Sequence, residues 1–125
     1  MSSAREDDDM ADVDQLITHI RAFTDERGWG RFHDPKSLIL ALVGEVGELA
    51  ELFQWINAGD AVEVFADPDR KQRAAEEMSD VLIYLLQPAD VLDVDLVPAA
   101  EDKLAAAARR YPAVDGVATD APLKE

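Results

Sequence analysis

Acidic side chains interrupt an apolar helical stripe in the middle of the chain, and this pattern constrains the fold strongly. Between residues 35 and 56, large apolar side chains recur every three or four positions, which predicts one helix with an apolar face. Glu45 falls in the middle of that face, and Glu48 lies beside it. A buried carboxylate is costly unless a cation or hydrogen-bond donor accompanies it. The stripe therefore predicts a packed helix that carries a polar site.

A second predicted helix, over about residues 68–92, repeats the anomaly. Glu77 lies on its apolar face and Asp80 lies next to it; the face is defined by Val81, Tyr84, Leu85 and Leu92. Four carboxylates on facing helices need counter-charge, and hard oxygen ligands suit Mg²⁺ or Mn²⁺. Pairing with Arg or Lys of another helix is the alternative, but two such pairs favour a metal. The predicted ligands are Glu45, Glu48, Glu77 and Asp80.

A di-iron helical bundle also builds its metal site from helix carboxylates. Such a site needs Glu-x-x-His pairs. The chain has two histidines, His19 and His33, and neither follows a Glu by three residues. The sequence therefore disfavours a di-iron centre.

Helical periodicity and breaker residues predict the remaining elements. We expect helices over about residues 13–27, 35–56, 68–92 and 98–110, and a short helical segment over 61–65. Asp34 before Pro35 and Asp67 before Pro68 are typical helix starts. Pro88 predicts a kink or an early end of its helix.

These elements predict an all-α protein, a bundle of four to five helices that dimerises through its helices. We expect a disordered acidic arm over residues 1–11, an all-α domain over 12–112 and a flexible tail over 113–125. Apolar residues also lie away from the main stripes, as at Ile39, Val43 and Leu82. They give more apolar surface than one bundle can bury, so we expect at least a homodimer.

Charge and composition exclude several classes of function. The net charge of −15 argues against binding to nucleic acid polymers or anionic membranes. It allows a single nucleotide, whose phosphates would need a metal cation beside the carboxylates. The absence of cysteine excludes a disulfide scaffold, a thiolate zinc site and a Cys nucleophile. No apolar run reaches the ~18 residues of a membrane span and no signal peptide is evident, so we expect a cytoplasmic protein.

Two segments, 41–55 and 76–84, resemble the MazG-like nucleotide pyrophosphohydrolases, nearest to the branch of dCTP pyrophosphatase type. The family signature is Glu-x-x-Glu, a spacer and Glu-x-x-Asp, and the resemblance extends over about residues 13–112. It implies an α-helical dimer, often a dimer of dimers, with active sites built from both chains. It also implies that the four acids bind Mg²⁺, which holds a nucleoside triphosphate. The implied reaction cleaves a (d)NTP, dCTP or a modified dCTP, to the monophosphate and pyrophosphate, in nucleotide-pool sanitation.

The same resemblance assigns substrate-binding positions. Those near the base and sugar are Trp29, His33, Trp55 and Tyr84, and those that can meet phosphates are Lys103 and Arg109. Aromatic rings in a loop can cover a base. From spacing alone, core packing explains Trp55 and Tyr84 equally well, and the basic residues could balance the C-terminus of a helix.

We expect water to attack the α-phosphate in line, with Glu48 or Glu51 as the base that takes its proton. The sequence departs from the family pattern at two sites, one of a single residue and one of two residues. Ala107 replaces an Asn that helps to read cytosine, and Gln87-Pro88 interrupts a helix. They leave two alternatives: a catalytically weakened nucleotide-binding or helical interaction protein, and a sister pyrophosphatase with another substrate.

Overall fold

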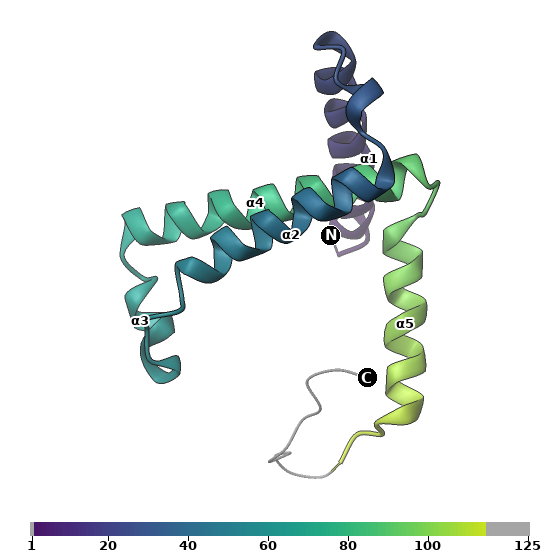
Figure 1. Cartoon of the computed structure of the whole chain (residues 1–125). Helices are drawn as coiled ribbons and strands as arrows, with labels where there is room; N and C mark the ends of the chain where they lie inside the picture. The colour runs from purple at the N-terminus through teal and green to yellow at the C-terminus, as the bar shows by residue number, and fades with distance from the viewer. Residues whose placement is uncertain (1, 115–125) are drawn as a thin grey trace. The chain divides into compact units, whose positions relative to one another are not determined.

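The computed structural model describes the backbone of residues 2–114 and the side chains of residues 12–114 except Phe32. Within this part, all regular structure is helical, which confirms the all-α prediction (Figure 1). The elements are α1 (Ser2–Glu26), η1 (Gly30–Phe32), α2 (Pro35–Glu51), η2 (Ala58–Asp60), α3 (Ala61–Val64), α4 (Pro68–Val91) and α5 (Leu96–Arg110). The contacts divide the chain into two compact units, with the boundary between Asp95 and Leu96. Helix α5, in the second unit, is therefore described by itself.

The two helices with acidic residues begin where the sequence predicts. Asp34 caps α2: its carboxylate accepts from the backbone N–H of Ser37 at 2.9 Å and from the Ser37 hydroxyl at 2.7 Å. Asp67 caps α4 by accepting from the backbone N–H of Arg70 at 3.1 Å. A proline follows each cap, where its missing N–H costs nothing. These local signals fix the start, and hence the register, of both helices.

Helix α2 ends earlier than its apolar periodicity predicts. Its last residue is Glu51, and tighter turns follow, with the N–H of Phe53 bonded to the carbonyl of Ala50 at 3.0 Å. The ring of Phe53 stacks on that of Phe65, with centroids 4.3 Å apart. This contact packs the end of α2 against the segment that returns the chain to α4. The prediction that the helix continues to Ile56 is therefore wrong.

Helix α4 continues through Pro88 to Val91 and does not end early. Pro88 is completely buried, and its neighbours Leu86 and Ala89 are buried too. A proline inside a helix removes one backbone hydrogen bond and costs about 3 kcal/mol. The burial of these side chains, at roughly 25 cal/mol per Å² of apolar surface, offsets that cost.

Helices α2 and α4 lie side by side and form the main contact of the first unit (Figure 1). Leu38, near the start of α2, and Leu86, near the end of α4, are almost fully buried and line one cavity. The helices are therefore antiparallel, so that the later turns of α2 lie beside the earlier turns of α4.

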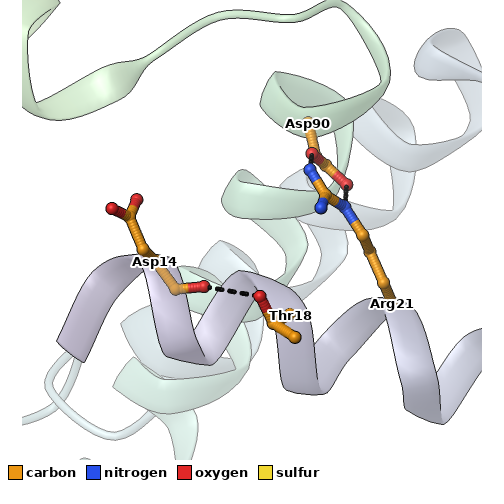
Figure 2. Close-up of polar contacts among 4 residues, drawn as sticks. All are labelled: Asp14, Thr18, Arg21 and Asp90. Atoms are coloured by element: carbon orange, nitrogen blue, oxygen red, sulfur yellow. Dashed lines mark hydrogen bonds and ion pairs between the residues drawn. The ribbon is translucent and has the colours of Figure 1, made fainter. Parts of the chain in front are cut away.

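Helix α1 packs on the C-terminal part of α4. The guanidinium of Arg21 donates to both carboxylate oxygens of Asp90 and thereby joins the two helices (Figure 2). Gly28 follows the helix with a φ of +65°, a conformation that glycine adopts without strain. The helix begins at Ser2, before the start expected near Val13.

The predicted ends of the chain lie at the limits of the described part. The structure describes no side chain within residues 1–11, and residues 115–125 lie outside the described residues. The acidic arm and the flexible tail therefore stay predictions. None of the helices within residues 2–114 combines the length and the apolar content needed to cross a membrane.

Candidate active site

Three of the predicted metal ligands come together between α2 and α4. Glu45 and Glu48 lie on α2 and Glu77 lies on α4, and one carboxylate oxygen from each lies within 4.8 Å of the others. The antiparallel pairing of the helices brings these positions together. We call this group the acidic cluster. It could bind a metal ion.

Burial and the repulsion of neighbouring charges disfavour the charged forms of Glu45 and Glu77. Burial raises the pKa of Glu45, and the charges of Glu48 and Asp80 raise it further. The pKa of Glu77 is raised by burial first and then by the same two neighbours. Asp80, the fourth predicted ligand, therefore acts electrostatically on both of these half-buried carboxylates. Such a group of anions needs a cation at neutral pH.

The cluster also contains polar atoms without partners. The Oε2 atoms of Glu45 and Glu77 are buried and accept no hydrogen bond from the described residues. Among the described side chains, Arg21 pairs with Asp90 and Arg27 pairs with Glu26, and neither pair includes a residue of the cluster. The Arg73 charge lowers the pKa of Glu77, but less than burial raises it. Pairing with basic residues therefore does not explain these carboxylates, and a hard cation fits their oxygens.

An aromatic cavity of about 330 Å³ lies between α1, the η1 loop and α4. Three predicted substrate-binding residues line it, Trp29, His33 and Tyr84. The rings of Trp29 and His33 are 6.5 Å apart, and Phe23 meets Trp29 edge-on at 5.5 Å. We call this space the aromatic pocket. Its walls can hold a flat apolar ring.

One face of α4 connects the acidic cluster to the aromatic pocket. Its polar or aromatic residues recur at helical spacing, at Glu77, Asp80, Tyr84 and Gln87. The rise of about 1.5 Å per residue separates Asp80 from Tyr84 by about 6 Å along the axis. A ligand lying along this face can therefore contact the cluster at one end and the pocket at the other.

Two other predicted site residues of the first unit lie outside this arrangement, and two more belong to the second unit. Trp55 lies beyond the end of α2 and is 88 % exposed. Glu51 is the last residue of α2, is exposed, and is not in the acidic cluster. Lys103 and Arg109 lie on α5, in the second unit.

Several residues of the pocket wall were not predicted from the sequence. Besides the predicted rings, the wall contains His19, Ile20, Phe23, Thr24, Ile83 and Gln87. Phe23 belongs to an apolar helical pattern, which predicts core packing and not a ligand site. Gln87 follows Tyr84 by three residues on α4, and this spacing is the signal that could have placed it in the wall.

Comparison with known proteins places these features in a family. Residues 41–122 match the model of the MazG-like family. The chain is 50 % identical over 91 residues to dCTP pyrophosphatase 1 of Homo sapiens, a match covering 73 % of this chain and 54 % of that protein. It is 48 % identical over 90 residues to dCTP pyrophosphatase 1 of Rattus norvegicus, covering 72 % and 53 %. The chain thus spans about half the length of the curated relatives that it matches.

A solved structure shows the same fold. The crystal structure of a pyrophosphatase from Archaeoglobus fulgidus DSM 4304 is similar with a TM-score of 0.74 and 39 % sequence identity. The similarity covers 80 % of this chain and 92 % of that chain.

Proposed function

This chain belongs to the MazG-like family, and from that premise we propose that it is a nucleoside triphosphate pyrophosphohydrolase. Its substrate is a (d)NTP, dCTP or a modified dCTP, which it cleaves to the monophosphate and pyrophosphate. The relatives named dCTP pyrophosphatase 1 support this choice of substrate. One observation of the structure carries the proposal: the buried, unpartnered carboxylate oxygen of Glu77 lies on the face of α4 that also lines the aromatic pocket, and Glu45 of α2 brings a second such oxygen to the same acidic cluster.

Mg²⁺ is the proposed cofactor, and Mn²⁺ could replace it. Glu45, Glu48, Glu77 and Asp80 would hold the ion through oxygen atoms, the ligands that such cations prefer. When bound, the ion supplies positive charge that neutralises the phosphates and developing negative charge. Without the ion, the negative charges of the four carboxylates would repel the phosphates of a nucleotide.

The aromatic pocket is the proposed base site. Trp29, His33 and Tyr84 present rings against which a base can stack. Stacking on such rings contributes about 1–3 kcal/mol per base. The phosphates then extend along α4 towards Asp80 and Glu77, because these residues precede Tyr84 on the same face.

The other predicted substrate contacts stay part of the proposal. Trp55 is exposed enough to meet substrate that a second chain binds, as the family resemblance implies. Lys103 and Arg109 on α5 carry the positive charge that phosphates require.

Hydrolysis requires a base that accepts a proton from water. The water oxygen forms a bond to the α-phosphorus, and the bond from that phosphorus to the bridging oxygen breaks. One proton of the water passes to a carboxylate, Glu48 or Glu51, and pyrophosphate leaves with the bridging oxygen. Glu48 is the stronger candidate because it lies in the acidic cluster.

We further propose a homodimer or a dimer-of-dimers tetramer. Apolar side chains of α2 and α4 are exposed in the single chain: Ile39 by 43 %, Val43 by 63 % and Leu82 by 46 %. A second copy would bury this surface. The proposed setting is the cytoplasm, and the proposed role is sanitation of the nucleotide pool.

A panel of canonical and modified nucleotides with Mg²⁺, followed by identification of the products, tests the reaction. We expect dCMP and pyrophosphate from dCTP. Release of orthophosphate would exclude the proposed bond cleavage. Stabilisation by Mg²⁺ and a nucleotide without turnover would select a nucleotide-binding protein instead, and faster cleavage of another nucleotide would select a sister pyrophosphatase.

A further inference from the structure

The face of α4 that carries Glu77 and Tyr84 continues into basic residues near the start of the helix. Arg73 precedes Glu77 by four residues and Arg70 precedes it by seven, spacings that return to the same side of a helix. Both arginine side chains are exposed. Followed from the aromatic pocket towards the start of α4, this face therefore passes from a ring through carboxylates to guanidinium groups.

The Arg73 guanidinium is close to the acidic cluster but is not paired with it. Burial raises the pKa of Glu77, and the charge of Arg73 acts on that pKa in the opposite direction. Such an interaction is expected of residues four apart on a helix, whose Cβ atoms are about 5–6 Å apart. Among the described side chains, however, no carboxylate forms an ion pair with Arg73. Its N–H donors are therefore available to an anionic ligand.

We propose that Arg73 binds the phosphates that leave as pyrophosphate, an inference that rests on the proposed function. With the base in the aromatic pocket and the α-phosphate beside the carboxylates, the β- and γ-phosphates extend past Glu77 towards the start of α4. Arg73 lies there, about 6 Å beyond Glu77 along the helix axis. The planar fork of a guanidinium matches the oxygens of a phosphate and can donate two hydrogen bonds to them.

A guanidinium at this end of the site also assists the reaction. When the bond between the α-phosphorus and the bridging oxygen breaks, its electron pair stays on that oxygen. Negative charge therefore builds up on the pyrophosphate, and Arg73 stabilises it. A monophosphate lacks both of the phosphates that Arg73 binds. Arg73 consequently favours ligands by their number of phosphates and not by their base.

Replacement of Arg73 by methionine, which removes the charge and keeps an unbranched side chain, tests the assignment. In Arg73→Met, kcat/KM for dCTP should fall about tenfold or more, the effect of losing a charge-assisted hydrogen bond. The Kd for dCMP, measured with Mg²⁺ present, should not change. Arg73→Lys keeps the charge and should restore part of the loss. A residue that acted only on the metal or on the helix would affect dCTP and dCMP alike, and that result would overturn the assignment.

The matched control is Lys71→Met. Lys71 is an exposed cation on the same helix, but six residues before Glu77, a spacing that places it on another side of the helix. Lys71→Met should keep the kcat/KM of wild type for dCTP. A fall equal to that of Arg73→Met would show a general effect of net charge and would overturn the specific role of Arg73.

Pyrophosphate itself probes the assignment without turnover. By calorimetry with Mg²⁺ present, wild-type protein should bind pyrophosphate about tenfold more tightly than Arg73→Met does. Equal affinities would overturn the assignment. If no nucleotide is hydrolysed but Arg73→Met weakens the binding of pyrophosphate, the proposed function fails and Arg73 stands as a phosphate ligand. If wild type cleaves dCTP to dCMP and pyrophosphate and Arg73→Met does so with unchanged kcat/KM, the proposed function stands and the role of Arg73 fails.

Discussion

Arg21 and Asp90 join helices that are far apart in the sequence: Nε of Arg21 lies 2.7 Å from Oδ2 of Asp90, and Nη2 donates to Oδ1 (Figure 2). This paired geometry is the strong form of a charged hydrogen bond. It holds α1 against the last turns of α4. Since α1 supplies Phe23 to the aromatic pocket, the bridge also positions one wall of the proposed base site.

The stability that this bridge contributes should depend on pH. The hydrogen bond from Arg21, followed by its charge, lowers the pKa of Asp90 below the ordinary value of 3.8. The unfolded chain therefore binds a proton more readily than the folded chain. The contribution is complete above the unfolded pKa and is lost as the pH falls through the folded pKa.

Asp90→Asn should consequently destabilise the protein at pH 7. The difference in free energy of unfolding between the variant and wild type should shrink as the pH falls below 3.8. Urea unfolding at several pH values measures this difference. Asp102→Asn, which replaces an exposed carboxylate on α5, is the control and should change the free energy of unfolding little at any pH. A difference for Asp90→Asn that stays constant with pH would show that the ion pair is not its cause.

The acidic cluster predicts opposite effects of one substitution with and without metal. Glu77→Gln removes a charge that burial and its neighbours disfavour, so metal-free protein should become more stable at neutral pH. The same variant should lose stabilisation by Mg²⁺, which for wild type is about 2.7 kcal/mol at a concentration one hundred times Kd. Thermal unfolding over a Mg²⁺ titration measures both effects.

Glu76→Gln is the matched control for this experiment. Glu76 is adjacent in sequence, exposed, and outside the acidic cluster. It should keep the full response to Mg²⁺. Equal responses of Glu77→Gln and wild type would remove Glu77 from the metal site.

Much of the site could be predicted because helical periodicity holds along α2 and α4. The anomaly of Glu45 and Glu77 within apolar stripes was visible in the sequence, and the structure brings their oxygens together with one of Glu48. Helical periodicity could not place Trp55, because it applies only along a continuous helix. Since α2 ends at Glu51, helical spacing from Glu48 no longer places Trp55, whose side chain is exposed.

Contacts between distant segments could not be read from local patterns. The bridge from Arg21 to Asp90 spans 69 residues, and no periodicity within α1 or α4 signals it. The aromatic pocket depends on that packing, so Phe23 could be assigned only to an apolar stripe. Pro88 shows the same limit in another form: burial in the folded protein outweighs its local tendency to end a helix.

Self-association should depend on the apolar surface of α2 and α4. Light scattering should give two or four times the chain mass of 13.7 kDa for wild type. Val43→Asp places a charge on a side chain that is 63 % exposed in the single chain, and it should shift the mass towards one chain. Val114→Asp, after α5, is the control and should not change the mass. A single-chain mass for wild type at micromolar concentration would contradict the proposed dimer.

Trp29 should contribute to substrate affinity through its ring. Trp29→Ala removes a wall of the aromatic pocket, so KM for dCTP should rise about tenfold, the lower part of the range for stacking on a base. Trp29→Phe keeps a ring and should restore most of the affinity. If Trp29→Ala changed kcat and left KM unaltered, the tryptophan would not act by binding the base.

Glu48 and Glu51 can be distinguished because only one of them lies in the acidic cluster. Glu48→Gln should lose both the stabilisation by Mg²⁺ and turnover, the latter by about 100-fold or more if the carboxylate also takes the proton of water. Glu51→Gln should keep the stabilisation by Mg²⁺, because its side chain is exposed at the end of α2. If turnover nevertheless falls 100-fold in Glu51→Gln, Glu51 is the base and Glu48 serves the metal alone. Full turnover in Glu48→Gln would exclude Glu48 from both roles.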